Sequence, residues 1–265
     1  MQNVSRLVTF VGAGNVASHL AVALAGAGYT IAGVYSRTMA SANALCERLG
    51  GVGQCPVGTD SFERLPVADV YIISVKDDAL PNVVAAWPAH CRQGVVLHTA
   101  GSVAMDVVKG TSDHYGVLYP MQTFSKDKAV DFSRVTCFVE GNDEVAENVA
   151  HELGEAVFGH CQKLSSEGRQ QLHMAAVFAC NFSNHMYALA YELLEAHDID
   201  PRCLLPLIAE TAGKVATLHP HDGQTGPARR GDRAVVARHE AALADNPELQ
   251  QIYNLLSESI LRRYD

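Results

Sequence analysis

The sequence predicts an α/β fold in two parts, a doubly wound and mainly parallel sheet followed by an all-helical segment. Over the first 164 of its 265 residues, short apolar runs alternate with helix-like stretches, and beyond them no strand signal remains. A third observation is the turn Gly12-Ala-Gly-Asn-Val-Ala17, which joins the first apolar run directly to a helical stretch. We therefore expect two domains, residues 1–164 and residues 165–265.

The strands of the first domain are expected where apolar residues run together. These runs are residues 7–11, 30–35, 69–75, 94–99, 116–119, 135–139 and 160–164. The run at 69–75 is almost continuously apolar, which is typical of a strand buried on both faces. Ligands of such sheets bind beyond the carboxyl ends of the strands, so the residues that directly follow each run are the first candidates for a site.

Four helices are expected in the second domain. Their ranges are residues 167–197, 201–218, 227–244 and 247–263, with a loop rich in His, Pro and Gly at 218–226. The first range contains no proline, and at 1.5 Å per residue it would be roughly 45 Å long. An apolar stripe along it indicates core or dimer contacts, and a more polar line beside it contains His173 and Asn184.

The turn after the first strand has the spacing G-x-G-x-x-A, and its place between a strand and a helix favours a dinucleotide-binding unit of Rossmann type. The first glycine allows a tight turn, and the second leaves the backbone open to a pyrophosphate. The helix that follows offers unpaired N–H groups and the positive end of its dipole. The predicted cofactor contacts here are Gly12, Ala13, Gly14, Asn15 and Val16.

The residues after the second strand indicate which nucleotide binds. NAD-binding chains usually place an Asp or Glu there for the ribose hydroxyls, but no acid occurs between Gly14 and Glu47. Arg37 can pair with a 2′-phosphate, and the hydroxyls of Ser36 and Thr38 can add hydrogen bonds. We therefore expect NADP(H) rather than NAD(H). The alternative is that Arg37 is a solvated residue at a helix start.

Further contacts are expected at the ends of the later strands. Cofactor contacts are predicted for Ser74, Val75, Lys76, His98, Thr99 and Ala100. Substrate contacts are predicted for Tyr119, Gln122, Thr225 and Arg230. A helix start with arginines nearby suits a carboxylate. The alternatives are a simple turn at residues 98–102, packing of residues 119–122 beside a proline, and a surface ion pair for the arginines.

Composition excludes several classes of partner. A net charge of −9 argues against nucleic acid or an anionic membrane as the main partner, because both require a basic face. No apolar stretch is long enough to span a bilayer, and the chain runs into its first strand without a signal peptide. The seven cysteines are scattered without a C-x-x-C pair, which favours reduced thiols in a cytoplasmic protein and no metal site.

Four segments resemble a family of two-domain oxidoreductases without an assigned substrate, which join a Rossmann-like domain to a helical domain of unknown function. They are the turn at 12–17, Tyr119-Pro-Met-Gln-Thr-Phe-Ser125, residues 172–185, and Thr225-Gly-Pro-Ala-Arg-Arg-Gly-Asp232. The family is similar in architecture to pyrroline-5-carboxylate reductase, 6-phosphogluconate dehydrogenase and β-hydroxyacid dehydrogenase. The resemblance implies a homodimer formed through the helical domain and an active site in the cleft between the two domains.

One departure from that superfamily concerns the proton donor. Its dehydrogenases use a lysine on the first long helix with an asparagine one turn later, and the corresponding stretch here has no lysine. His173 is the nearest polar candidate, Val177 lies one turn on, and Asn181 and Asn184 follow. A histidine can do the same work, because its ordinary pKa lies near neutrality.

The leading hypothesis is an NADP(H)-dependent oxidoreductase that transfers a hydride to or from a small carbonyl, hydroxyl or imine substrate. His173 would be the proton donor, and Asn181 or Asn184 would position the substrate. One alternative is a sensor or scaffold protein that binds NADP(H) without turnover. Another alternative is a dimeric domain that has lost its nucleotide site. The intact glycine turn argues against this alternative.

Overall fold

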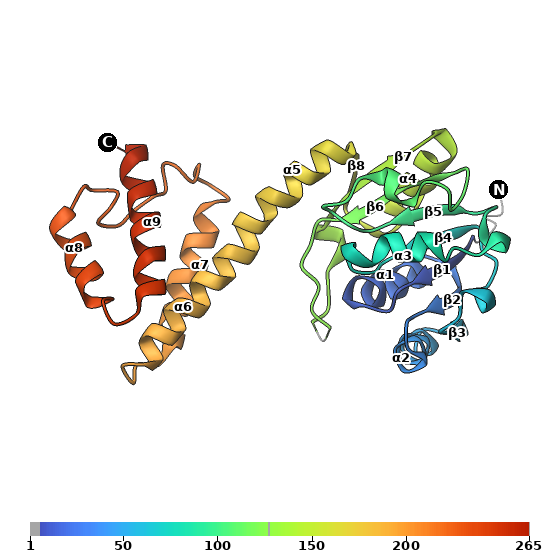
Figure 1. Cartoon of the computed structure of the whole chain (residues 1–265), viewed down its shortest axis with the longest axis horizontal. Helices are drawn as coiled ribbons and strands as arrows, with labels where there is room; N and C mark the ends of the chain where they lie inside the picture. The colour runs from blue at the N-terminus through green and yellow to red at the C-terminus, as the bar shows by residue number, and fades with distance from the viewer. Residues whose placement is uncertain (1–5, 127, 265) are drawn as a thin grey trace. The chain divides into compact units, whose positions relative to one another are not determined.

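The computed structural model describes residues 6–126 and 128–264 (Figure 1). It divides into two compact units, the first ending at Val177 and the second beginning at Phe178. The expected boundary lay earlier, between residues 164 and 165, where the last strand ends. The first unit also includes the helix after that strand, because side chains of this helix bond to residues of the sheet. The extents of the two domains stay a prediction.

The first unit is built on one eight-stranded sheet, counted over the described residues. The strands are β1 Leu7–Val11, β2 Thr30–Tyr35, β3 Val57–Thr59, β4 Val70–Ile73, β5 Val95–His98, β6 Tyr115–Pro120, β7 Thr136–Gly141 and β8 His160–Lys163. Their order is β3-β2-β1-β4-β5-β6-β7-β8, and β6–β7 is the one antiparallel pair among them. The doubly wound, mainly parallel sheet is therefore confirmed. The order reverses between β1 and β4, which is where such sheets bind ligands.

Helices cover both faces of the sheet (Figure 1). They are α1 Asn15–Gly26, α2 Met39–Gly50, α3 Leu80–Ala85 and α4 Glu144–Val157. Successive strand residues point to opposite faces, so Ile72 joins the core beneath α1, α2 and α4, whereas Ile73 joins the core beneath α3. Both cores consist of fully buried aliphatic and aromatic side chains, which accounts for the nearly unbroken apolar strand sequences.

Strand β3 was not predicted, because three residues are too few to show a pattern of alternation. The long predicted helix at 167–197 is present, but it is interrupted. It consists of α5 Ser166–Ala176, a π-helical segment Val177–Phe182, and α6 Ser183–Glu195. Such π segments are rare and are often found at functional sites.

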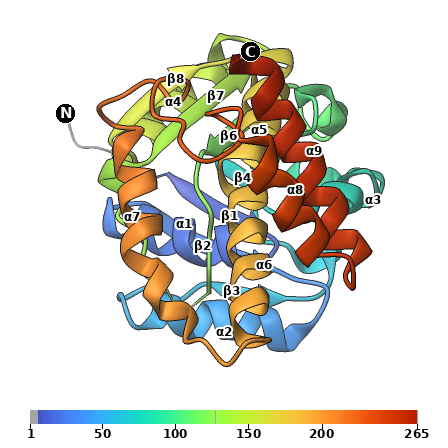
Figure 2. The same ribbon diagram turned by 90° about the vertical axis from the view of Figure 1, so that its left-hand side faces the viewer.

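The second unit is helical, as predicted (Figure 2). After α6 it contains a short 3-10 helix Pro201–Leu204, then α7 Leu205–Lys214, α8 Arg233–Ala242 and α9 Pro247–Tyr264. The predicted helix at 227–244 begins late, because residues 227–231 form turns and Asp232 caps α8 by accepting from the Val235 amide at 3.1 Å. None of the described helices has the length and apolar character that crossing a bilayer would require.

The Gly12 backbone yields a first prediction about stability. Gly12 has a φ of +117°, and a Cβ placed there would lie 2.1 Å from the Ser74 carbonyl oxygen. Gly12→Ala should therefore lower the free energy of unfolding by about 2 kcal/mol or more, measured by urea denaturation. Gly14→Ala is the matched control, because no atom lies within 4 Å of its added Cβ, and its cost should stay below about 1 kcal/mol. Equal losses in the two variants would contradict this account.

Candidate functional site

The carboxyl ends of β1, β4, β5 and β6 gather most of the predicted site residues of the first unit. At the end of β1, the Gly12 amide donates to the Tyr35 carbonyl at 2.8 Å, and the Ser74 amide donates to the Val11 carbonyl at 2.8 Å. These bonds hold the glycine turn between β2 and β4. The turn therefore lies at the topological switch point of the sheet.

The start of α1 fits a pyrophosphate. Gly14 is its N-cap, no side chain caps the helix, and its first turn contains no acidic residue. Beside Gly14 the space that a Cβ would fill is open, so nothing keeps an anion from the amides of residues 14–16. Ala13 packs against the core, and the Asn15 side chain donates to the Phe124 carbonyl at 2.8 Å. Asn15 thus ties the loop after β6 to this helix start.

The residues after β2 divide into two roles. The Thr38 hydroxyl caps α2 by accepting from the Ser41 amide at 3.3 Å and donates to the Ser41 hydroxyl at 2.9 Å. Ser36 bonds through its amide to the Thr59 carbonyl at 3.0 Å. Arg37 is exposed, and within residues 6–126 and 128–264 it makes no hydrogen bond or ion pair. The guanidinium is therefore available to a phosphate.

The ends of β4 and β5 bond to each other. Ser74 is buried and accepts from the Thr99 hydroxyl at 3.2 Å. Val75 packs against the core beneath α3, and Lys76 is exposed. The Ser102 hydroxyl donates to the Asp77 carboxylate. Asp77 directly follows the predicted contacts at 74–76 but was not among them.

His98 has the role of a turn residue. It is fully buried, and its Nδ1 accepts from the Ala100 amide at 3.2 Å. Burial, together with the nearby Arg169 guanidinium, lowers the pKa of His98 to about 3, so the ring is neutral near pH 7. The His98 side chain is buried and bonds to the turn that contains Thr99 and Ala100. The cofactor contacts predicted for these three residues stay predictions.

Tyr119 and His173 form the polar pair of the site. The Tyr119 hydroxyl lies 3.2 Å from His173 Nδ1, and the two rings meet edge to face with centroids 6.2 Å apart. Tyr119 is buried at the end of β6, whereas His173 on α5 is half-buried. The pair packs against the bare backbone of Gly101, where a Cβ would lie 2.6 Å from His173 Nδ1 and 2.8 Å from the tyrosine ring.

Arg169 places His173. Its side chain is 1% exposed, and its guanidinium donates to Glu140 Oε2 at 2.6 Å and to the Val103 carbonyl at 2.6 Å. Glu140 also accepts from the Ser166 amide at 2.8 Å at the start of α5. Arg169 and Glu140 were not predicted from the sequence, and Gly101 was expected only as part of a turn. Arg169 lies one helical turn before His173, so its position on the same helix face was a signal that could have identified it.

Five further residues were predicted to contact or position the substrate. Gln122 is exposed in the loop after β6, where its carbonyl oxygen accepts from the Thr123 amide at 2.8 Å. Asn181, Asn184, Thr225 and Arg230 belong to the second unit, and all four are exposed. Their roles stay predictions. Among the described residues, no three His, Cys, Asp or Glu side chains gather as a metal site.

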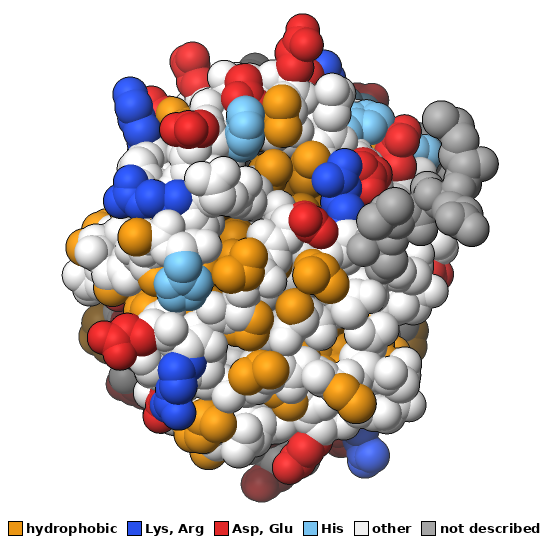
Figure 3. All heavy atoms as spheres, turned by 90° about the vertical axis from the view of Figure 1, so that its right-hand side faces the viewer, with side chains coloured by type: hydrophobic (Ala, Val, Ile, Leu, Met, Phe, Trp, Pro, Cys, Tyr) orange, Lys and Arg blue, Asp and Glu red, His pale blue; other side chains and the backbone are white. Residues whose placement is uncertain are grey.

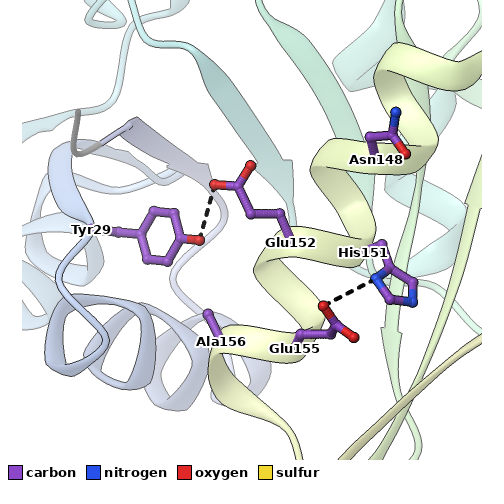
Figure 4. Close-up of a pocket in the computed structure, with 6 residues that line it drawn as sticks. All are labelled: Tyr29, Asn148, His151, Glu152, Glu155 and Ala156. Carbon is purple, nitrogen blue, oxygen red and sulfur yellow. Dashed lines mark hydrogen bonds and ion pairs between the residues drawn. The ribbon is translucent and has the colours of Figure 1, made fainter. Parts of the chain in front are cut away.

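A hollow of about 490 Å³ is lined by Tyr29 and by residues of α4 (Figure 4). Tyr29 directly precedes β2, so the hollow is at the amino end of that strand. The Tyr29 hydroxyl donates to Glu152 at 3.2 Å, and His151 pairs with Glu155 at 3.4 Å. Burial raises the pKa of Tyr29 to about 12. Glu152 is also ion-paired with Arg6 at 2.9 Å, so the charged groups of this hollow already have partners within the chain.

Charges of both signs are dispersed over the face of the molecule shown in Figure 3. Outside the residues drawn in grey, Lys and Arg side chains on this face are not gathered into one patch, and hydrophobic side chains lie among polar ones. This distribution agrees with the net charge of −9, which argued against a polyanionic partner.

The neutral, buried His98 yields a prediction about acid stability. Its pKa is depressed in the folded state, so between about pH 6.5 and pH 3 the unfolded chain binds a proton that the folded chain excludes. Stability from this residue is therefore lost as the pH falls through that window, by up to about 1.4 kcal/mol per pH unit. His98→Asn keeps an acceptor for the Ala100 amide and should show a shallower loss in urea unfolding. Parallel curves for the two proteins would contradict the buried, neutral state.

Comparisons with known proteins agree with this geometry. The family described as NADP oxidoreductase coenzyme F420-dependent matches residues 7–101, and a domain of unknown function, DUF2520, matches residues 135–260. No curated protein matches the chain. A protein from Bacteroides fragilis named a "putative NADP oxidoreductase" has a solved structure that is 41% identical, with a TM-score of 0.90, over 97% of this chain and 98% of that chain.

More distant structures share the fold. A pyrroline-5-carboxylate reductase from Coxiella burnetii is 16% identical, with a TM-score of 0.56, over 97% of this chain and 96% of that chain. An imine reductase from Streptomyces aurantiacus is 16% identical, with a TM-score of 0.62, over 96% of this chain and 95% of that chain.

These matches confirm the resemblance carried by the four sequence segments. At 41% identity over nearly its whole length, and with both domain types in the same order, the chain belongs to the family of NADP oxidoreductases in which a Rossmann-type nucleotide-binding domain precedes a DUF2520 domain.

Proposed function

We propose that this protein is an NADP(H)-dependent oxidoreductase that transfers a hydride to or from a small carbonyl, hydroxyl or imine substrate, with His173 as the proton donor. The observation that carries the proposal is the contact between His173 and Tyr119 at the carboxyl end of β6, on the same sheet edge as the glycine turn. A nucleotide site and a group able to exchange a proton are the two parts that such a reaction requires.

The residues present fit NADP(H). The amides at the start of α1 would hold the pyrophosphate, and the unpaired Arg37 would hold the 2′-phosphate. The turns at 74–76 and 98–100 would face the nicotinamide half, since they lie on the other side of the switch point. When bound, NADP(H) supplies the hydride. The match to the nucleotide-binding family covers residues 7–101 and supports this cofactor, but it does not extend to the residues around His173.

His173 would hold the proton that the substrate takes up. The ring is half-buried, and its Nδ1 lies 3.2 Å from the Tyr119 hydroxyl. An imidazole ordinarily titrates near neutrality, which lets it protonate a forming alkoxide or amine and recover the proton from solvent. Tyr119 and Gln122 would contact the substrate beside it. Asn181, Asn184, Thr225 and Arg230 remain candidates to position a polar or carboxylate group of the substrate.

We further propose a homodimer formed through the helical unit. Among its described residues, Ala228 and Ser257 are the buried ones, whereas Phe178 is 66% exposed, Leu207 63% and Leu255 63%. Helices whose apolar side chains remain in water gain little free energy from burial, and this gain has to offset the conformational entropy that is lost on folding. A second copy of the chain is a partner that is always present in equal amount, and it would bury these side chains.

The cofactor assignment predicts a selective loss on removal of Arg37. In the purified protein, NADPH and NADP should raise the Tm more than NADH and NAD. Arg37→Ala should weaken NADPH binding by roughly 10- to 100-fold and leave NADH binding unchanged, because only the bonds to the 2′-phosphate are lost. Arg48→Ala is the matched control, because Arg48 is an exposed arginine on α2, the helix that begins just after Arg37. Equal binding of the four nucleotides would contradict the assignment.

The proton-transfer role predicts a loss of turnover without a loss of cofactor. With a panel of keto acids and cyclic imines, NADPH oxidation should be detectable, and His173→Ala should lower kcat by about 10²- to 10⁴-fold. The Tm shift caused by NADPH should remain. Unchanged turnover would remove His173 from the reaction. Firm NADPH binding with no hydride exchange on any substrate would instead favour a sensor or scaffold protein.

A further inference from the structure

The Tyr119 hydroxyl has two possible acceptors. It lies 3.2 Å from His173 Nδ1 and 3.5 Å from the sulfur of Met121. Burial raises the pKa of Tyr119, so the phenol keeps its proton near neutral pH. A hydroxyl has one proton to donate, and a thioether is a much weaker acceptor than an imidazole nitrogen. Donation to Nδ1 is therefore the stronger use of that proton; the alternative is donation to Met121, with the hydroxyl accepting from a protonated Nδ1.

An Nδ1 atom that accepts a hydrogen bond cannot itself carry a proton. In the neutral ring the proton must then reside on Nε2, because one nitrogen is a donor and the other an acceptor. Within the part of the chain that the structure describes, His173 Nε2 has no hydrogen-bond partner. The ring is also half-buried rather than closed off. The N–H is thus left for a ligand.

The Tyr119–His173 pair is constrained by the backbone of Gly101 and by the helix that contains Arg169. Gly101 brings bare backbone against both rings, and any side chain there would displace His173 Nδ1 or the Tyr119 ring. Arg169, one turn before His173, fixes the helix through its ion pair with Glu140 at 2.6 Å. Asp77 on the β4 side and Arg169 on the α5 side are the charges that act on the Tyr119 phenol, in opposite directions.

We infer that Tyr119 is a positioning residue which holds neutral His173 in its Nε2–H tautomer, so that the proton for the substrate is presented from Nε2. The use of that proton rests on the proposed function. The tautomer itself does not, since it follows from contacts within the unliganded chain.

The test is nitrogen NMR of the whole protein with ¹⁵N-labelled histidine, recorded without substrate at a pH where the ring is neutral. The His173 signals are assigned by their loss in His173→Ala. The wild type should show a protonated Nε2 and an Nδ1 shifted as a hydrogen-bond acceptor. Tyr119→Phe should move Nδ1 toward the position of a free ring nitrogen, and Gly101→Ala should do the same by displacing the ring.

Tyr115→Phe is the matched control, because Tyr115 lies on the same strand and its hydroxyl bonds to Asp106 at 3.2 Å, away from the pair. A proton on His173 Nδ1 in the wild type would overturn the inference. So would an Nδ1 signal that is the same in Tyr119→Phe and in the wild type. The Tm of each variant with NADPH reports that it has folded.

Kinetics separate this inference from the proposed function. With any substrate found, Tyr119→Phe should lower kcat by roughly tenfold, a larger effect than its effect on KM, and the pH profile of kcat should shift. If the NMR result holds but no substrate is turned over, the inference stands and the proposed function fails. If turnover depends on His173 but Nδ1 is protonated, the function stands and the inference fails.

Discussion

The buried ion pair between Arg169 and Glu140 is the interaction on which the candidate site depends. Arg169 lies at the start of α5 with 1% of its side chain exposed, and Glu140 lies near the end of β7. The same guanidinium bonds to the Val103 carbonyl, and Glu140 bonds to the Ser166 amide and hydroxyl. An unpaired charge at this depth would cost several kcal/mol, so the helix has one favourable register against the sheet. His173, one turn further on, takes its position from that register.

Two histidines near this ion pair show how environment decides chemistry. His98 is fully buried close to the Arg169 guanidinium, which keeps it neutral and confines it to bracing a turn. His173 is half-buried, bonds to a tyrosine hydroxyl, and retains an open side. Sequence alone treats both as polar residues on strand or helix ends. The fold makes His98 a structural group and leaves His173 partly exposed, beside a tyrosine hydroxyl.

The helical stretch that contains His173 has no lysine, so an imidazole would have to supply the proton here. A lysine is a flexible point charge that can donate without a supporting group. An imidazole must be oriented and must have its proton on the correct nitrogen, which requires a partner for the other nitrogen. Tyr119 is such a partner, and Gly101 leaves room for both rings. The π-helical segment that follows at Val177–Phe182 marks the end of the unit that contains this pair.

The sequence by itself determined the sheet, its mainly parallel order, the glycine turn and the helical second half. Each of these follows from local patterns: runs of apolar residues, the G-x-G-x-x-A spacing, and helical periodicity. It also identified Arg37, Tyr119 and His173 as separate candidates. The three-residue strand β3, the π segment and the late start of α8 were not predicted, because short or irregular elements carry little periodic signal.

Only the tertiary structure decided which candidates act together. Residues 101, 119 and 173 are far apart in the chain, and no local pattern shows that a glycine is required where two rings meet its backbone. Burial gives His98 the role of a hydrogen-bond acceptor within a turn and Arg169 that of an ion-pair partner of Glu140. Both roles depend on the surrounding tertiary structure. Local sequence sets backbone preference over a few residues. Long-range packing sets distance, solvent access and protonation, and these are the quantities that define a site.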